Sequence, residues 1–284
     1  LYGALAARQR AVDASKAVRL SVPVVVVGNV IAGGAGKTPT TLAIVQHLKA
    51  RGWRPGIVSR GHGRASSDCR EVGPGADPQD VGDEPLLLRR RADVPVFVAP
   101  RRAEAGRALL AAHPACDILV CDDGLQHVAL ARDVEICVFD ARGIGNGWLL
   151  PAGPLREPWP RAVDLVLYTE APPKPVGAGL PAMAAPAEHK FPIAGKPAPT
   201  TFTATRHLAH HALRTDGTRV PLAELRGQRL TAVAGIARPE AFFTLLRAAG
   251  LTLADTIALP DHYDFNSWSR LPDKRQGLIC TEKD

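Results

Sequence analysis

The sequence is poor in aromatic residues and contains no long uninterrupted apolar run. Phe, Trp and Tyr together make up 5% of the 284 residues, which leaves few side chains for stacking on nucleic-acid bases. No stretch approaches the roughly 18 apolar residues that a membrane-spanning helix needs. These two shortages argue against a base-stacking nucleic-acid protein and against a chain that crosses a bilayer.

The five cysteines lack the spacing of a metal site or a redox pair. No Cys-x-x-Cys pair occurs among Cys69, Cys116, Cys121, Cys137 and Cys280. Two of them, Cys121 and Cys137, lie in apolar runs, where cysteine usually packs as a small buried hydrophobe. We therefore expect a reduced, cytosolic compartment.

Apolar residues make up 46% of the chain and charged residues 22%, as in ordinary globular proteins. The length allows one large domain or two modest ones. The formal net charge of +7 suits an anionic partner such as a nucleotide, a nucleic acid or an acidic lipid surface. Charge alone does not choose among these partners.

Short apolar runs alternate with helix-like segments through the first 170 residues. The runs are continuous rather than alternating, which is typical of strands buried on both faces. Helices are expected at 39–51, 86–91 and 101–112, and strands at 22–28, 56–59, 94–99, 117–121, 134–140 and 164–169. This alternation predicts an α/β fold with a mostly parallel sheet and helices on both of its faces.

A second, smaller α/β domain is expected after a Pro- and Ala-rich linker. We place the nucleotide-binding core at 1–198, the linker-like stretch at 171–199 and the smaller domain at 199–284. Segments 200–205 and 219–222 flank Asp216-Gly217, which suggests a hairpin turn. Beyond it, 229–234, 239–249 and 253–259 have the pattern of a strand, a helix and a strand.

A glycine-rich loop follows the first apolar strand. It runs Gly33-Gly34-Ala35-Gly36-Lys37-Thr38-Pro39 and opens a helix whose first turn tolerates proline. Glycines let backbone N–H groups approach phosphate oxygens, Lys37 neutralises phosphate charge and the Thr38 hydroxyl ligates Mg²⁺. The strict pattern would have glycine where this chain has Ile31. The loop predicts binding of a nucleoside triphosphate.

An acidic pair, Asp122-Asp123, ends the apolar run Ile118–Cys121. Carboxyl ends of parallel strands face the ligand crevice, so these carboxylates are candidates to hold Mg²⁺. Capping of a helix is the alternative role. A second pair, Asp83-Glu84, is by itself equally consistent with an ordinary helix start, and His262 is equally consistent with a loop residue of no special role.

Taken in order, these motifs resemble one family. The motifs are Gly-Asn-Val-Ile-Ala-Gly-Gly-Ala-Gly-Lys-Thr-Pro, Ser-Arg-Gly-His-Gly-Arg, Gly-Asp-Glu-Pro, Asp-Asp-Gly-Leu-Gln-His, Gly-Pro-Leu-Arg-Glu-Pro, Ala-Gly-Ile-Ala-Arg-Pro, Leu-Pro-Asp-His-Tyr and Thr-Glu-Lys-Asp. Together they closely resemble the tetraacyldisaccharide 4'-kinases, the lipid A 4'-kinases of Gram-negative bacteria. The similarity runs from about Leu1 to Asp284.

The resemblance implies transfer of the ATP γ-phosphoryl group to the 4'-hydroxyl of a tetraacylated disaccharide 1-phosphate. It also implies ATP and Mg²⁺ as cofactors, a lipid A disaccharide precursor as partner, and peripheral attachment to the anionic cytoplasmic face of the inner membrane. We expect a monomer that binds no nucleic acid.

The family's site residues map onto this chain by motif. Asp83 and His262 would form a catalytic dyad, and Asp122, Asp123 and Glu157 would serve Mg²⁺ together with Thr38. Candidates to bind the anionic acceptor are Arg60, Arg102, Gln126 and Arg156. A carboxylate that accepts the hydroxyl proton late in a loose transition state is a sensible base, which suits Asp83.

Some features depart from the family pattern. His62 stands where the family usually has Tyr, and the family's hydrophobic N-terminal helix and the continuation after Asp284 are largely absent from this sequence. The alternatives are a GTPase or partitioning-type switch, or a basic protein that uses a nucleotide structurally. A GTPase would need an Asn-Lys-x-Asp motif, which this sequence does not contain. A basic binding protein would give Asp83 and His262 no function.

Overall fold

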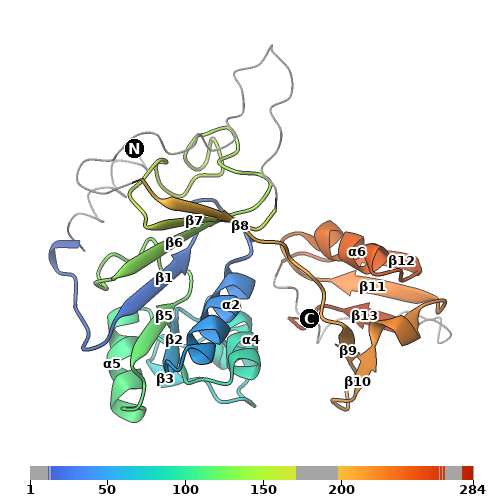
Figure 1. The fold of residues 1–284 in the computed structure, drawn as a ribbon, viewed down its shortest axis with the longest axis horizontal. Coiled ribbons are helices and arrows are strands. Elements are labelled where there is room, and N and C mark those ends of the chain that lie inside the picture. Colours follow the sequence, from blue (N-terminus) through green and yellow to red (C-terminus); the bar gives the residue numbers. More distant parts are fainter. Residues whose placement is uncertain are drawn as a thin grey trace. The chain divides into compact units, whose positions relative to one another are not determined.

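The computed structural model describes residue 12, residues 14–170 and 198–261, residues 263 and 265, and residues 277–283. The chain divides into two compact units, residues 1–205 and 206–284 (Figure 1). His262 and almost all of the linker expected at 171–199 lie outside the described residues. The division falls later than the boundary expected at residue 199.

The first unit is built on an eight-stranded sheet in the order β3-β4-β2-β5-β1-β6-β7-β8. All neighbouring strands are parallel except β3, which is antiparallel to β4. The strands are β1 (Val24–Gly28), β2 (Pro55–Ser59), β3 (Arg70–Glu71), β4 (Val96–Val98), β5 (Ile118–Cys121), β6 (Val134–Phe139), β7 (Leu165–Tyr168) and β8 (Thr200–Thr203). The predicted α/β fold with a mostly parallel sheet is confirmed.

The central strands are apolar throughout because helices or loops cover both faces of the sheet. Every residue of β1, β2, β4 and β5 is buried. Helices α2 (Lys37–Ala50), α3 (Pro78–Val81) and α4 (Asp83–Ala92) follow β1 and β3, and α5 (Arg102–Ala112) follows β4. One apolar core contains Val45 of α2 and Leu88 of α4, and the other contains Leu109 of α5.

The strand order reverses at β1, and this reversal places the site. From β1 the chain builds outward through β2, β3 and β4 and returns to β5, which lies directly beside β1. It then crosses to β6, on the other side of β1, and continues through β7 to β8. In open parallel sheets the ligand crevice lies at the carboxyl ends of the strands, at such a switch point. The loops after β1, β5 and β6 therefore meet there.

The second unit has a hairpin and a small parallel sheet. The hairpin pairs β9 (His211–Leu213) with β10 (Arg219–Pro221), and a short 3₁₀ helix, η1 (Leu222–Leu225), follows. The sheet has the order β12-β11-β13, with β11 (Leu230–Ala234), β12 (Leu253–Ala258) and β13 (Gly277–Cys280). Helix α6 (Pro239–Ala248) joins β11 to β12 and packs Phe243 and Leu246 into the core of this unit.

One strand partner predicted from the sequence is wrong. The turn at Asp216-Gly217 exists, since Arg214 N donates to Thr218 O at 2.9 Å, but its first strand is β9 rather than the segment 200–205. That segment instead contains β8, which pairs parallel to β7 in the main sheet. A tight hairpin needs strands adjacent in sequence, and 200–205 lies too far from the turn.

Candidate functional site

The phosphate loop spans the gap between β1, which ends at Gly28, and α2, which begins at Lys37. Gly33 and Gly36 have φ of +85° and +87°, a left-handed conformation that glycine adopts without steric cost. Pro39 is the third residue of α2, where a helix has no intrahelical use for an N–H. The strand, loop and helix expected from the sequence are therefore present.

The carbonyl groups of this loop are occupied. Five successive carbonyls, from Ala32 to Gly36, each accept a hydrogen bond. The donors are Arg142 to Ala32 O at 3.2 Å and to Gly34 O at 3.1 Å, Asn29 Nδ2 to Gly33 O at 3.3 Å, Thr169 Oγ1 to Ala35 O at 3.3 Å and Thr40 Oγ1 to Gly36 O at 2.9 Å.

The amide groups of the same residues are left for a ligand. Among the residues that the structure describes, the backbone N–H groups of Gly33 to Gly36 donate to no protein acceptor. Successive free N–H groups beside a helix N-terminus form a concave site for an anion. The Lys37 ammonium lies on the same side, 3.4 Å from Asn29 Oδ1 and 3.7 Å from Asp123 Oδ1. The arrangement suits the phosphate chain of a nucleotide.

The first half of the loop explains why Ile31 replaces the usual glycine. Ile31 is 1% exposed and forms an antiparallel bridge with Leu155. Ala32 N donates to Pro154 O at 2.8 Å, and Arg156 N donates to Val30 O at 2.7 Å. This backbone pairing holds Ile31 in a β-bridge, a setting that a β-branched residue adopts readily. The segment 154–156 thus pins the phosphate loop.

Asp123 connects the loop after β5 to two cations. Its Oδ1 lies 2.8 Å from Arg156 NH2 and 3.7 Å from Lys37 Nζ. Its φ of +44° is left-handed, a conformation that among non-glycine residues Asp and Asn tolerate best. The backbone thereby turns the carboxylate toward the phosphate loop.

Asp122 is buried, and only one of its carboxylate oxygens is bonded. Thr41 Oγ1 donates to Oδ1 at 2.7 Å, whereas Oδ2 has no hydrogen-bond partner within the described ranges of the chain. Burial, helped by the negative charges of Glu84 and Asp123, raises the pKa of Asp122 to about 7, against the Thr41 hydrogen bond and the charge of Lys37. A buried carboxylate oxygen that accepts no hydrogen bond is available to ligate a cation.

The Gly-Asp-Glu-Pro motif also lies near Asp122, because the charge of Glu84 acts on the Asp122 carboxylate. Asp83 and Glu84 are the first residues of α4, and Asp83 Oδ1 accepts a hydrogen bond from Glu84 N at 2.8 Å. Asp83 is half-buried. The preceding Gly82 has a φ of +90°, and a side chain there would meet the backbone of Gly61 and His62 at 3.0 to 3.2 Å. The loop after β2 therefore packs directly against the residue before Asp83.

Asn29 joins several functional groups, and sequence reasoning did not single it out. It is fully buried, and its Oδ1 accepts hydrogen bonds from Lys37 and Arg156. Its carbonyl accepts from Gln126 Nε2 at 2.8 Å. Its position directly after a buried strand was the signal that could have identified it.

Glu157 is connected to Asn29, at the start of the phosphate loop, through Gln126. It is 3% exposed, and its carboxylate accepts from Gln126 at 2.7 Å and from Arg161 at 3.3 and 3.4 Å. Arg161 also pairs with Glu135 at 2.7 Å. These contacts describe a carboxylate that holds Gln126 and the 154–156 segment in place.

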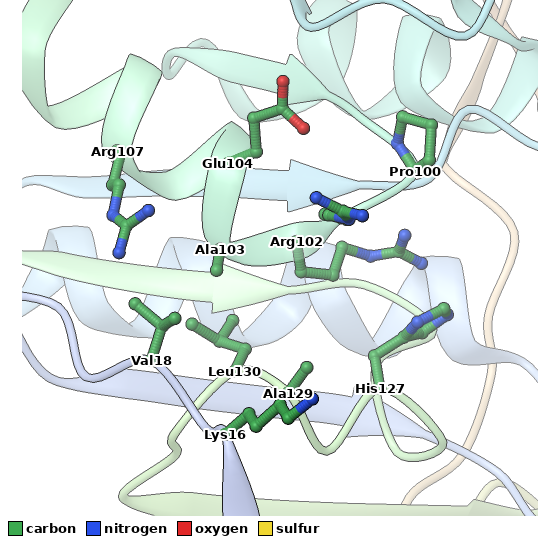
Figure 2. A pocket seen from close by; sticks show the side chains of 11 residues that line it. Lys16, Val18, Pro100, Arg102, Ala103, Glu104, Arg107, His127, Ala129 and Leu130 are labelled. Carbon is green, nitrogen blue, oxygen red and sulfur yellow. The ribbon is translucent and has the colours of Figure 1, made fainter. Parts of the chain in front are cut away.

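A basic pocket of about 690 Å³ lies beside the start of α5 (Figure 2). Its charged lining residues are Lys16, Arg101, Arg102, Arg107, His127 and one acid, Glu104. Arg102 is 3% exposed and donates to Ala99 O and Asp123 O, both at 3.4 Å, so the pocket reaches the acidic loop. Burial and the charges of Arg102 and Arg60 lower the pKa of His127 to about 4, which keeps its imidazole neutral. The exposed Arg60 therefore acts on the same site.

Metal ligation would require more than the protein's own carboxylates. In the described part of the chain, no three His, Cys, Asp or Glu side chains form a set that could hold a metal ion. Mg²⁺ commonly takes only one or two carboxylates and completes its shell with phosphates and waters. The unpartnered Oδ2 of Asp122 and the half-buried Thr38 fit that kind of site.

Arg142, Asp140 and Thr169 were also absent from the sequence-based list of site residues. Asp140 directly follows β6, and a carboxylate at the carboxyl end of a buried strand is a signal that could have identified it. Thr169 directly follows β7, the same position relative to a strand that Asn29 has after β1, whereas Arg142 carried no such signal.

A parallel α/β sheet, a glycine loop with a lysine, and an acidic loop at the switch point together define a phosphate-loop nucleotide-binding protein. Comparison with known proteins narrows this class. The model of the family described as tetraacyldisaccharide-1-P 4'-kinase matches residues 1–284. The chain belongs to this family of kinases in lipid A biosynthesis.

Relatives and a solved structure agree with this assignment. A tetraacyldisaccharide 4'-kinase of Acidovorax sp. (strain JS42) is 60% identical, with 100% of this chain and 78% of the relative covered. That of Delftia acidovorans is 52% identical, with 100% and 79% covered. The crystal structure of LpxK from Aquifex aeolicus in complex with ATP has a TM-score of 0.78 at 27% identity, with 100% and 85% covered. The predicted family, fold and enzyme class are confirmed.

Proposed function

We propose that this chain transfers the γ-phosphoryl group of ATP to the 4'-hydroxyl of tetraacyldisaccharide 1-phosphate. The observation that carries the proposal is the phosphate loop, in which every carbonyl from Ala32 to Gly36 accepts a hydrogen bond while the amides of Gly33 to Gly36 donate to no acceptor in the described part of the chain. In the reaction the bond between the γ-phosphorus and the bridging oxygen of ADP breaks. The sugar oxygen forms the new bond and loses its proton.

The nucleotide is held by Gly33, Gly34, Ala35, Gly36 and Lys37, with Pro39 in the first turn of α2 supporting the loop. Thr38, Asp122 and Asp123 would hold Mg²⁺, which neutralises charge on the phosphates when it is bound. Glu157 contributes by positioning Gln126, since its oxygens are engaged by Gln126 and Arg161.

Asp83 accepts the proton of the attacking hydroxyl, and His262 orients Asp83 or shares the proton. The half-buried carboxylate of Asp83 lies on the helix whose Glu84 acts electrostatically on Asp122. A carboxylate base suits a loose phosphoryl-transfer transition state, in which the hydroxyl becomes acidic only late.

The acceptor's anionic end is bound by the basic pocket. Arg102 of the pocket lining supplies a guanidinium group, the charge of Arg60 acts on the same place, and Arg156 contributes a third guanidinium, which pairs with Asp123. The Gln126 side-chain amide donates to Asn29 O and to Glu157 Oε1 within the protein, so its side-chain oxygen is what it offers to a sugar hydroxyl. Neutral His127 can accept or donate one further hydrogen bond.

A lipid acceptor requires contact with a membrane surface. None of the described helices has the length and apolar character needed to cross a bilayer. The net charge of +7 supports binding to an anionic surface, and we propose that the chain binds peripherally, as a monomer, to the cytoplasmic face of the inner membrane.

The deciding experiment is transfer of labelled phosphate from ATP to tetraacyldisaccharide 1-phosphate in detergent, with Lys37→Ala as the matched inactive control. We expect label in the lipid with the wild type and a loss of roughly 10³-fold or more with the variant. Turnover of GTP without any labelled lipid would refute the proposal.

A further inference from the structure

Arg142 contacts the phosphate loop from outside, and no part of the proposed chemistry uses it. It lies just beyond β6, and its guanidinium donates to Ala32 O at 3.2 Å and to Gly34 O at 3.1 Å. The two carbonyls lie on either side of Gly33. The planar guanidinium group therefore bridges the two residues that flank Gly33, whose φ is +85°.

The guanidinium is itself held by a buried acid. Asp140 is 0% exposed, and its oxygens lie 2.9 to 3.1 Å from Nε and NH2 of Arg142. Asp140 Oδ1 also accepts from the backbone N–H of Arg142 at 3.0 Å. Because Asp140 directly follows β6, and β6 pairs with β1, the anchor is attached to the strand beside the one that carries the loop.

The Arg142–Asp140 pair acts on the phosphate loop through its geometry rather than through its charge. The carboxylate of Asp140 neutralises the guanidinium at about 3 Å, so the pair adds little net charge near the phosphates. Fixing the carbonyls of Ala32 and Gly34 also fixes the planes of the peptide groups that follow them. Those peptide groups carry the N–H of Gly33 and the N–H of Ala35, which are two of the four free amides.

We propose that Arg142, held by Asp140, is a positioning residue that pre-orients the phosphate loop for the nucleotide. A fixed loop loses less conformational entropy when a ligand binds, which raises affinity. The inference rests on the proposed binding of ATP at this loop. It assigns Arg142 no contact with the nucleotide or with the acceptor.

The test compares Arg142→Ala and Arg142→Lys in the full chain by equilibrium binding of ATP and by steady-state kinetics. We expect the alanine variant to raise Kd and KM for ATP roughly 10- to 100-fold, because hydrogen bonds from a charged donor are lost. KM for the lipid acceptor should change less than about 2-fold. The lysine variant keeps the charge but lacks the planar fork, so it should recover only a minor part of the affinity.

A matched control removes an arginine–aspartate pair at the opposite end of the strands. Arg54 precedes β2, and its Nε lies 3.2 Å from Asp117 Oδ2, just before β5. Arg54→Ala should leave the affinity for ATP unchanged. The double variant Arg142→Ala with Asp140→Asn also removes the buried negative charge that Arg142 neutralises, and it should remain folded while it still binds ATP weakly.

The outcomes are separable. Wild-type protein that binds no ATP overturns the proposed function itself. Wild-type binding that Arg142→Ala leaves intact overturns only the anchoring role. Full recovery by Arg142→Lys shows that charge rather than geometry is what matters, and this also overturns the inference.

Discussion

Arg156 and Asp123 form an ion pair across the site, with NH2 2.8 Å from Oδ1 and NH1 3.4 Å from Oδ2. Arg156 belongs to the segment that pins the phosphate loop, and Asp123 belongs to the loop after β5. Lys37 lies 3.7 Å from the same Oδ1 atom. One carboxylate therefore sets the relative positions of two cations beside the phosphate loop.

Asp123→Asn should remove this function without unfolding the chain. Asparagine tolerates the φ of +44°, whereas its neutral amide no longer attracts Arg156 and Lys37. We expect kcat to fall roughly 10²-fold while the melting temperature stays within a few degrees of the wild type. Phosphate transfer and thermal unfolding, measured on the same preparation, check this. Retention of wild-type kcat would show that Asp123 has no part in catalysis.

Asp83→Ala should reduce the chemical step and leave nucleotide binding intact. A lost general base costs roughly 10²-fold or more in kcat, and the phosphate loop does not use this side chain. Single-turnover transfer together with ATP affinity separates the two effects. A variant that no longer binds ATP would identify Asp83 as a nucleotide or metal ligand. If Asp83 and His262 act as a pair, the double variant should be little worse than either single one.

The raised pKa of Asp122 predicts that the free energy of unfolding of the metal-free, nucleotide-free protein depends on pH. Its pKa in the folded state is raised from about 3.8 to about 7, so the folded state holds this proton more tightly than the unfolded chain does. The contribution of Asp122 is therefore most favourable below pH 4 and is lost as pH rises toward 7. Denaturant unfolding of Asp122→Asn should show stabilisation at pH 8, on the order of a few kcal/mol, that disappears near pH 4. A difference between variant and wild type that is flat across this range would contradict the raised pKa.

Glu157 should matter for stability as well as for activity. Its side chain is 4% exposed, and Glu157→Ala would leave Arg161 and Gln126 without one of their acceptors. Breaking such a buried pair costs on the order of 3 kcal/mol, partly offset here because Arg161 keeps its bond to Glu135. Urea unfolding measures the loss, and Glu157→Gln should lose less because it keeps an acceptor oxygen. Equal stability of Glu157→Ala and wild type would refute the positioning role.

Arg102→Ala should weaken binding of the lipid acceptor and spare that of ATP. Arg102 lines the basic pocket, and its Nε atom has no hydrogen-bond partner among the described residues. We expect KM for tetraacyldisaccharide 1-phosphate to rise about 10-fold, the effect of one lost charge-assisted hydrogen bond. Arg51→Ala, at the far end of α2, is the matched control and should change neither KM. An increase confined to KM for ATP would move Arg102 to the nucleotide side of the site.

Much of the first unit followed from local sequence patterns. Buried parallel strands are continuous apolar runs, so β1, β2, β5, β6 and β7 were predicted close to their observed bounds. Strands β3, β9 and β13 were not predicted, since segments of two to four residues with little burial carry almost no pattern. The partner of β8 was wrong because sheet edges are completed by segments distant in sequence, and a local turn signal does not report them.

The chemical identity of the site was determined by the sequence alone, because a glycine loop between strand and helix and a carboxylate pair at a strand end are local features. Where those features lie relative to one another was decided by tertiary structure. The order β5-β1-β6 brings Asp122 and Asp123 to one side of the phosphate loop and Asp140 with Arg142 to the other. Asn29 meets Arg156 across 127 positions of the chain, and Arg142 meets Gly34 across 108. Contacts over such separations depend on which strands are neighbours, and hydrophobic periodicity within a segment contains no information about its neighbour.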